Sequence, residues 1–477
     1  MKNKDRNKKL FKDTGAFFLG TISSRFIAVI MMPLYTALLS TGDYGISDEI
    51  NTTVSLLSPL LTLSVSEAVL RFSFEKDKNK NHIMFSALIF IIASTVLLMF
   101  LPVFINTERV FGGAYWKMFV LTYLGYNLQR AFSFYARGCD KVKLVALSGI
   151  IQTFSVVSIN VLLLAVLKTG LEGYLWSYVF GYAISIGVLF FGVRKTIRIS
   201  EMKFDGGLIK EMLHYSIPMI PANLIWWINN SSDKYIIAYL IDVGARGIYA
   251  AAYRIPSIMD SVVSVFNDAW RITAFSDEGK GFAEYFVSIY EKINSLCILM
   301  CGGLMVFCEL IAKILFSNEF FKGWSCIPFL LLSFLFSTMA GMLASIFTRE
   351  KRTGQLLVST VVGSVLNIIL NFLLIGRFGI RAAAATTLFA FFVSWGIRLI
   401  QVKRTAGIDI AAAESLPGYI ILLVMAVVMT LELKYRYFIC IPLFLILFWI
   451  NFGKFTEIIK PIIGVVKSKL TNKENTL

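Results

Sequence analysis

Arginines inside long apolar runs are the side chains of this sequence best placed to do chemistry. Arg25, Arg130 and Arg254 each lie about 8–11 residues from the nearer end of such a run, roughly 12–16 Å along a helix. No acid stands three or four residues away from any of them. Because a guanidinium stays protonated and binds phosphate oxygens in pairs, the three arginines predict a cationic cavity for an anionic group such as a phosphate. The alternative is pairing with acids of other helices.

Asp260 is the acid of comparable depth, and it too lacks a helical partner. Two interpretations stay open. Asp260 could form an ion pair with Arg25 or Arg254, or it could carry a proton as a coupling residue. Since three deep arginines face one deep aspartate, the predicted cavity keeps a positive charge in either case.

Two acid–base pairs lie one helical turn apart near the ends of apolar runs, and we expect both to be structural ion pairs. They are Glu67 with Arg71 and Asp268 with Arg271. No metal site is expected, because the six cysteines show no paired spacing and the two histidines stand alone near expected loops. No cofactor is expected either, since the sequence contains no glycine-rich phosphate loop.

Composition places these residues in a membrane. Apolar residues make up 57% of the chain, charged residues 16%, and the mean hydropathy is +0.72. A soluble domain carries roughly 45–50% apolar and about 25% charged residues. The net charge of +16 reflects the lysines and arginines of cytoplasmic loops rather than nucleic-acid binding, because no basic stripe interleaved with aromatic residues lies outside the apolar runs.

The sequence predicts an all-α integral membrane protein with about fourteen transmembrane helices, each long enough to cross about 30 Å of hydrocarbon. An even number places both termini on one side of the membrane. Lysine and arginine favour the segments on that side by about three to one, so we expect both termini in the cytoplasm. The expected spans are 14–40, 46–73, 83–105, 113–137, 145–167, 171–193, 212–240, 247–275, 286–312, 324–348, 353–376, 379–401, 415–433 and 437–452.

The first twelve expected helices look like two copies of one six-helix unit. Segments 43–46 and 245–248 occupy the same place in each copy, a short loop with a glycine before the second helix. We therefore expect two pseudo-symmetric halves, 1–205 and 206–405, followed by 406–477 with two more helices and a cytoplasmic tail. Transporters commonly bind their substrate between such halves. Chance similarity among apolar helices is the alternative.

Prolines interrupt the first helix of each expected half. Pro33 lies in one half, and Pro218 and Pro221 lie in the other. A proline inside a spanning helix frees a backbone carbonyl and bends the helix axis. We expect these three prolines to act as hinges beside the cavity, with static kinks as the alternative.

Several loose motifs follow one another in a fixed order along residues 10–405. They are PLYTALLS at 33–40 with DYG at 43–45, SLLSPLLTL at 55–63, YSIPMIP at 215–221, GIYA at 247–250, and the segment from Asn367 to Asn371 with Gly376 and Gly379. With these motifs the chain resembles the bacterial polysaccharide flippases of the O-antigen and capsule (Wzx) type. Those flippases share a superfamily with MATE multidrug exporters and lipid II flippases. Arg381-Ala382 departs from the pattern, because such proteins often have Gly-Ala there.

The resemblance implies a MATE-like fold and a substrate, an oligosaccharide on undecaprenyl diphosphate, that moves from the cytoplasmic to the outer leaflet for cell-surface polysaccharide synthesis. It also implies the bacterial cytoplasmic (inner) membrane as location. Membrane lipids, a polysaccharide polymerase and glycosyltransferases are the implied partners, and nucleic acid is not. Ser24-Arg25 is similar to a pair in lipid II flippases, where a helix-1 arginine serves the cavity. Candidates to face the sugar, or else to pack, are Asn223, Trp226, Trp227, Asn229, Asn230 and Tyr253.

Two other functions remain open. A multidrug or cation exporter of the MATE type needs an acidic or aromatic cavity, whereas the deep charge here is net positive. A membrane glycosyltransferase or sugar polymerase needs a loop large enough for a catalytic site, and the longest expected outer loop has only about a dozen residues. We therefore expect that the protein is not an enzyme.

Overall fold

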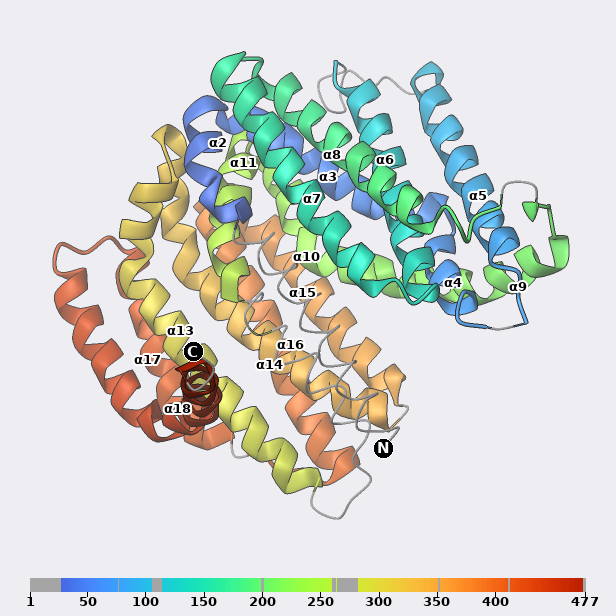
Figure 1. Ribbon diagram of the computed structural model, residues 1–477. Helices are drawn as coiled ribbons and strands as arrows, with labels where there is room; N and C mark the ends of the chain where they lie inside the picture. The colour runs from blue at the N-terminus through green and yellow to red at the C-terminus, as the bar shows by residue number, and fades with distance from the viewer. Residues whose placement is uncertain are drawn as a thin grey trace. The chain divides into compact units, whose positions relative to one another are not determined.

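Helices form all of the regular structure in the described part of the chain. The computed structural model describes residues 27–75, 77–104, 114–198, 201–259, 263, 282–350, 352–410 and 412–474. Every regular element within these ranges is helical, which confirms the predicted all-α class (Figure 1). A helix satisfies its own backbone N–H and C=O groups, as the hydrocarbon of a bilayer requires.

Eight of the described helical segments are long and apolar enough to cross a membrane, and a ninth span consists of two helices that meet at a bend of 67°. The expected spans 14–40 and 247–275 lie partly outside the described residues. With the shorter apolar helices added, the observed set is compatible with about fourteen spans. The eight are α5 (Lys80–Phe100) with η1 (Leu101–Val103), α7 (Val142–Asn160) with η3 (Val161–Val166), α8 (Gly170–Val193), α13 (Phe282–Leu315), η6 (Asn318–Cys326) with α14 (Ile327–Arg349), α15 (Thr353–Phe378), α16 (Ile380–Ala406) and the first part of α18 (Arg436–Glu474).

The bent span and the shorter helices complete the described structure. The bent span is α3 (Thr41–Leu61) followed by α4 (Val65–Phe72). The others are α2 (Met32–Leu38), α6 (Trp116–Gly138), α9 (Gly206–Ser216), η5 (Ile217–Met219), α10 (Ile220–Leu240), α11 (Val243–Ala252) and α17 (Ala412–Thr430).

Contacts group the helices into two compact units. The first contains residues 1–250 and 315–318, and the second contains 251–314 and 319–477. Helices α9, α10 and α11, which belong to the second expected half of the sequence, therefore pack within the first unit. The division into 1–205, 206–405 and 406–477 describes a sequence repeat and stays a prediction.

The core of the first unit lies among α4, α5, α6, α8 and α9. Its members are small or aliphatic residues that allow close helix packing, with Tyr135 as one of the largest fully buried side chains. Examples from the five helices are Val65, Ala68, Val69, Ile83, Met84, Ala131, Ala136, Leu189, Val193, Leu208 and Met212. This core holds α4 against α6, and that contact positions the site described below.

Two glycines allow α3 and α11 to approach each other closely. A Cβ on Gly45 would lie 2.1 Å from the carbonyl oxygen of Val243, and a Cβ on Gly247 would lie 2.0 Å from the carbonyl oxygen of Thr41. Neither position has room for a side chain. The two glycines come from the 43–46 and 245–248 segments of the sequence, so the recurring loop motif corresponds to one helix contact.

The break between α3 and α4 follows Pro59, which lies inside α3. Leu63 and Ser64 both take left-handed backbone conformations, with φ of 53° and 54°, and α4 begins at the next residue. These two residues change the chain direction by 67°. The bend brings the first turn of α4 to a cavity in the first unit.

The predicted hinge prolines lie where one helical segment follows another. Pro33 is in α2, within a helical stretch that begins at Ile27, and Pro218 and Pro221 are in η5 and the first turn of α10, directly after α9. A proline at such a position removes a backbone N–H donor from the helical path. Pro218 and Pro221 mark the joint between α9 and α10, and their role as hinges stays a prediction.

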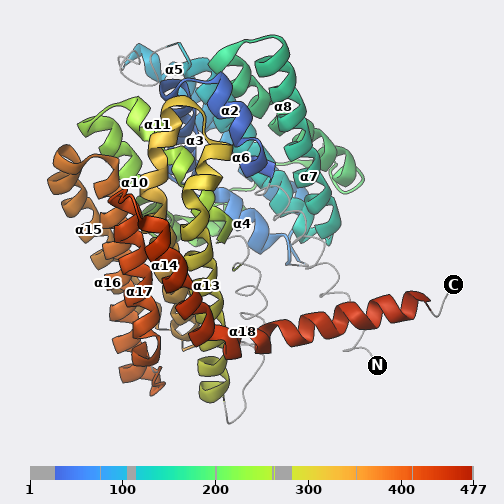
Figure 2. The ribbon, with the colours of Figure 1, turned by 90° about the vertical axis from the view of Figure 1, so that its left-hand side faces the viewer.

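The second unit is built around α14, α15 and α16, which pack side by side in Figure 1 and Figure 2. The guanidinium of Arg398 on α16 donates to Ser359 Oγ at 2.9 Å, Thr360 Oγ1 at 2.9 Å and the carbonyl oxygen of Ala340 at 2.7 Å. Arg398 therefore links α14, α15 and α16 by hydrogen bonds.

Candidate functional site

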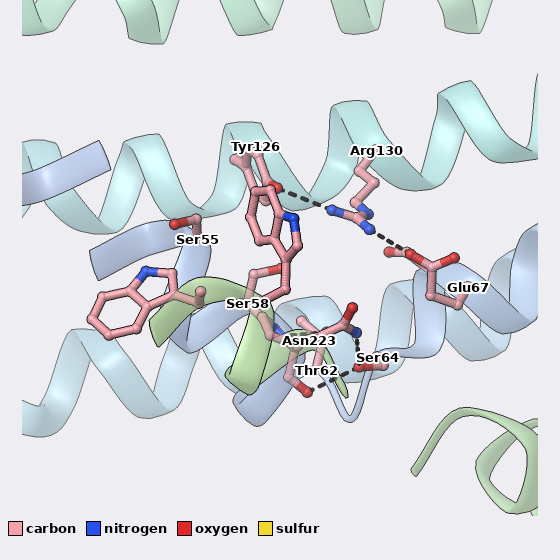
Figure 3. Close-up of a pocket in the computed structure, with 12 residues that line it drawn as sticks. Ser55, Ser58, Thr62, Ser64, Glu67, Tyr126, Arg130 and Asn223 are labelled. Carbon is pink, nitrogen blue, oxygen red and sulfur yellow. Dashed lines mark hydrogen bonds and ion pairs between the residues drawn. The ribbon is translucent and has the colours of Figure 1, made fainter. Parts of the chain in front are cut away.

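A cavity of about 380 Å³ lies in the first unit where α3 breaks into α4. Helices α3, α4, α6 and α10 supply its walls (Figure 3). Its lining is rich in hydroxyl groups and contains one basic and one acidic residue. The lining residues are Ser55, Ser58, Pro59, Thr62, Ser64, Ser66, Glu67, Tyr126, Arg130, Asn223, Trp226 and Trp227.

Arg130 on α6 points its guanidinium at this cavity wall. Its Nη1 donates to the Tyr126 hydroxyl at 3.0 Å, and its Nη2 donates to the carboxylate of Glu67 on α4 (Figure 3). The guanidinium carbon also lies 5.3 Å from the centre of the Phe134 ring. The predicted cavity arginine thus lines a cavity, but its charge is met by an acid from another helix, which was the alternative interpretation.

The structure gives Glu67 and Arg71 other partners than each other. Arg71 pairs with Glu75 at 3.0 Å, and its side chain is 55% exposed. Glu67 pairs with Arg130. The physical reason is the bend before α4, which turns the first turn of that helix toward α6, while Arg71 lies at the other end of α4 beside the loop that holds Glu75.

Hydroxyl and amide groups line the rest of the cavity, and several of them form hydrogen bonds with one another. Ser58 Oγ donates to Asn127 Oδ1 at 2.6 Å, and Asn223 Nδ2 donates to Ser64 Oγ at 3.3 Å. The Ser66 hydroxyl is buried and has no hydrogen-bond partner among the described residues. Such groups suit a polar, hydroxyl-bearing ligand.

Two indoles complete the cavity. Trp226 is 67% exposed, and Trp227 is anchored by a hydrogen bond from Nε1 to the carbonyl oxygen of Thr52 at 2.8 Å. Asn223, Trp226 and Trp227 were expected as sugar-facing candidates, and the structure brings all three to the cavity. The exposed ring of Trp226 next to hydroxyl groups gives a surface with both apolar and hydrogen-bonding parts.

The lining of this cavity, within the part of the chain that the structure describes, does not include Arg254. Arg25 and Asp260 lie outside the described residues, as do Asp268 and Arg271. Arg254 lies in helical residues of the second unit, where its backbone carbonyl accepts a hydrogen bond from Ser257 Oγ at 2.6 Å. A shared site of Arg25, Arg130 and Arg254, and the roles of the three other residues, stay predictions.

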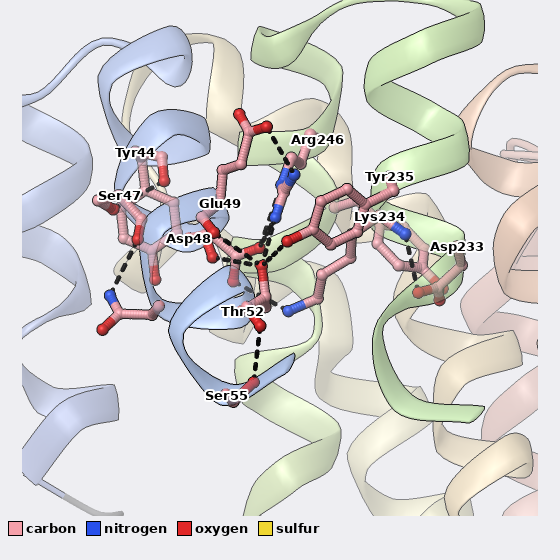
Figure 4. Close-up of polar contacts among 12 residues, drawn as sticks. Tyr44, Ser47, Asp48, Glu49, Thr52, Ser55, Asp233, Lys234, Tyr235 and Arg246 are labelled. Carbon is pink, nitrogen blue, oxygen red and sulfur yellow. Dashed lines mark hydrogen bonds and ion pairs between the residues drawn. The ribbon is translucent and has the colours of Figure 1, made fainter. Parts of the chain in front are cut away.

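A second polar cluster in the first unit was not predicted as a site. Asp48 on α3 accepts from Lys234 Nζ at 2.9 Å and pairs with Arg246 Nη2 at 3.3 Å (Figure 4). Arg246 also donates to Thr52 Oγ1 at 2.6 Å, and its guanidinium carbon lies 4.3 Å from the ring centre of Tyr235. Arg246 is fully buried, with 0% of its side chain exposed.

Three acids and two bases meet in this Asp48 cluster. Glu49 lies 3.9 Å from Arg246, and Asp233 accepts from the Lys234 backbone N–H at 2.9 Å and from the Tyr249 hydroxyl at 2.7 Å. Sequence reasoning found Lys234 inside a span but placed Arg246 in a loop. The signal that could have found the cluster was the repeated glycine motif, because Asp48 and Arg246 stand beside Gly45 and Gly247, where α3 and α11 touch.

The comparisons with known proteins agree with this structure. A family model described as "Polysaccharide biosynthesis protein" matches residues 10–271, more than half of the chain. The chain belongs to this family. No match was found among curated proteins. Membership of the family confirms the resemblance proposed from the sequence motifs.

Solved structures with the same fold are transporters. The lipid II flippase MurJ in an inward closed conformation aligns with 94% of this chain and 99% of its own, at 16% identity and a TM-score of 0.71. An inward-facing MATE multidrug transporter aligns with 81% of this chain and 94% of its own, at 13% identity and a TM-score of 0.67. A superfamily transporter from Pyrococcus furiosus gives 11% identity and a TM-score of 0.56, over 83% of this chain and 94% of its own. The fold of this family member is therefore MATE-like, and the protein is a multi-pass membrane protein.

Proposed function

We propose that the protein flips an oligosaccharide carried on undecaprenyl diphosphate from the cytoplasmic to the outer leaflet by alternating access, for cell-surface polysaccharide synthesis. The observation that carries this proposal is the composition of the cavity lining: an arginine paired with a glutamate, five serine or threonine hydroxyls and two indoles. Arginine is the side chain best suited to bind phosphate oxygens in pairs. The hydroxyl groups and Trp226 suit a sugar, whose faces are partly apolar and whose edges form hydrogen bonds.

The remaining assignments follow from this function. The protein lies in the bacterial inner membrane with both termini in the cytoplasm, and it works on membrane lipids beside a polysaccharide polymerase and glycosyltransferases. It is a transporter and not an enzyme. An inside-negative potential favours outward movement of an anionic head group by about 2.3 kcal/mol per charge per 100 mV if the charge crosses fully.

A multidrug or cation exporter is the second candidate, because MATE transporters share the fold. Such a function requires a wall that attracts cations. In the cavity of the first unit the acid, Glu67, is already paired with Arg130. A cationic drug would have to displace a guanidinium, which favours the flippase over the exporter.

The direct genetic test compares Arg130→Ala with Arg71→Ala. We expect Arg130→Ala cells to accumulate lipid-linked sugar and to export about 10- to 100-fold less, since a hydrogen-bonded charge contributes about 1.5–3 kcal/mol. Arg71 is a matched control, because it is paired with Glu75 and does not line the cavity. Normal export in Arg130→Ala cells would remove Arg130 from the substrate site.

A further inference from the structure

We propose that Glu67 is a resident counter-anion that holds Arg130 while the cavity is empty, and that a phosphate of the incoming lipid displaces it. The inference rests on the proposed function and adds a residue that sets which anions the cavity accepts. In the empty protein the carboxylate fills the position on the guanidinium that a phosphate oxygen takes when substrate is bound.

Accessibility separates this ion pair from an ordinary buried one. The side chain of Arg130 is 35% exposed and that of Glu67 is 19% exposed, and both line the cavity. The pair of Arg246 with Asp48 has the same chemistry, but its side chains are 0% and 11% exposed. A ligand in the cavity can reach the guanidinium of Arg130, whereas no ligand can reach that of Arg246 without unpacking α3 from α11.

Glu67 is the charged partner that a phosphate can replace on the Arg130 guanidinium. Tyr126 occupies Nη1 from the same helix, one turn away, while Glu67 occupies Nη2 from another helix. Among the described residues Arg130 is the one ion-pair partner of Glu67, and the Arg137 guanidinium attracts the carboxylate only from a greater distance. The carboxylate can therefore leave by a side-chain rotation that breaks one interaction.

Charge balance explains why such a residue is useful to a flippase. An arginine facing a low-dielectric region without an anion is costly, so an empty cavity needs a counter-charge before the protein can return without cargo. A diphosphate brings more charge and more oxygens than a carboxylate and binds the guanidinium through two of its N–H groups. The Ser66 hydroxyl is buried in the cavity lining and has no hydrogen-bond partner among the described residues. It can therefore donate a further hydrogen bond to the phosphate that replaces Glu67.

Competition predicts the sign of a mutational effect. While Glu67 holds Arg130, the apparent affinity for an anion is reduced by the fraction of time that the guanidinium is occupied. Glu67→Gln keeps the shape of the side chain and removes its charge. This variant should therefore bind a lipid diphosphate more tightly and release it more slowly. If the ion pair were only structural, its loss would weaken the binding or leave it unchanged.

The test measures binding of farnesyl diphosphate to the purified full-length protein in detergent, with farnesol as the uncharged control. We expect Glu67→Gln to bind farnesyl diphosphate about tenfold more tightly than wild type and to flip substrate more slowly. Glu75→Gln is the matched control, because Glu75 also pairs with an arginine but does not line the cavity, and its affinity should stay within about twofold. The double variant Glu67→Gln/Arg130→Gln should lose the gain.

The outcomes separate this inference from the function on which it rests. If the wild-type protein binds farnesyl diphosphate and a folded Glu67→Gln protein binds it no more tightly, the proposed role of Glu67 is wrong. The flippase proposal is then unaffected. Tighter binding that persists in the double variant also overturns it, since the gain then does not come from Arg130. Absence of farnesyl diphosphate binding in wild type and in every variant contradicts both proposals. Monodispersity and thermal unfolding of each variant show that it is folded.

Discussion

At the residue scale, an arginine paired with a carboxylate occurs in two different environments. Arg130 with Glu67 is an accessible pair on a cavity wall, and Arg246 with Asp48 is a closed pair between helices. The sequence predicted a deep position for Arg130 from its distance to the ends of an apolar run, and that depth stays a prediction. It could not predict Glu67 as the partner, because the bend before α4 decides where that carboxylate points.

The Asp48 cluster gives a stability prediction. Asp48→Ala leaves Lys234 and Arg246 buried without their shared carboxylate, and we expect a loss of about 3–5 kcal/mol in the free energy of unfolding. Asp409→Ala is the control, because the Lys403–Asp409 pair is exposed on both sides and should contribute less than about 1 kcal/mol. Denaturant unfolding of the two purified proteins in detergent measures both values. Equal stabilities would show that the cluster does not hold α3 to α10 and α11.

At the element scale, the joints between helices carry more information than the helices themselves. The length and composition of the apolar runs already indicated most spans. Pro59 lies inside α3, but the bend of 67° occurs at Leu63 and Ser64, which take left-handed conformations. Neither residue type signals that conformation, which glycine, asparagine and aspartate favour, so the division into α3 and α4 could not be predicted.

The close contact of α3 with α11 gives the prediction at this scale. Gly247→Ala places a methyl group 2.0 Å from the carbonyl oxygen of Thr41, so the helices must separate, and we expect a loss of about 1–3 kcal/mol. Gly149→Ala in α7 is the matched control, since nothing lies within 4 Å of the added carbon. The control should be neutral or stabilising by about 0.5–1 kcal/mol, as alanine is the better helix former. Thermal unfolding midpoints that fall equally in both variants would contradict the packing argument.

At the scale of the whole molecule, the apolar runs were enough to predict an all-helical membrane protein, and the ordered motifs were enough to predict its family. The contact-based units could not be predicted, because residues 206–250 pack with the N-terminal helices although the repeat assigns them to the other half. The Asp48 cluster is part of this packing, because its ion pairs join α3 to α10 and α11. Any motion that separates α3 from α10 and α11 would have to break this contact.

Reconstitution tests the central claim most directly. The purified protein is placed in vesicles with an oligosaccharide-diphosphate lipid, and a membrane-impermeant lectin or glycosidase reports how fast the sugar reaches the opposite leaflet. We predict faster translocation than in protein-free vesicles, a rate about 10- to 100-fold lower with Arg130→Ala, and little change with Arg71→Ala. Vesicles that carry the wild-type protein, transport a cationic dye and leave the lipid-linked sugar in its original leaflet would contradict the account.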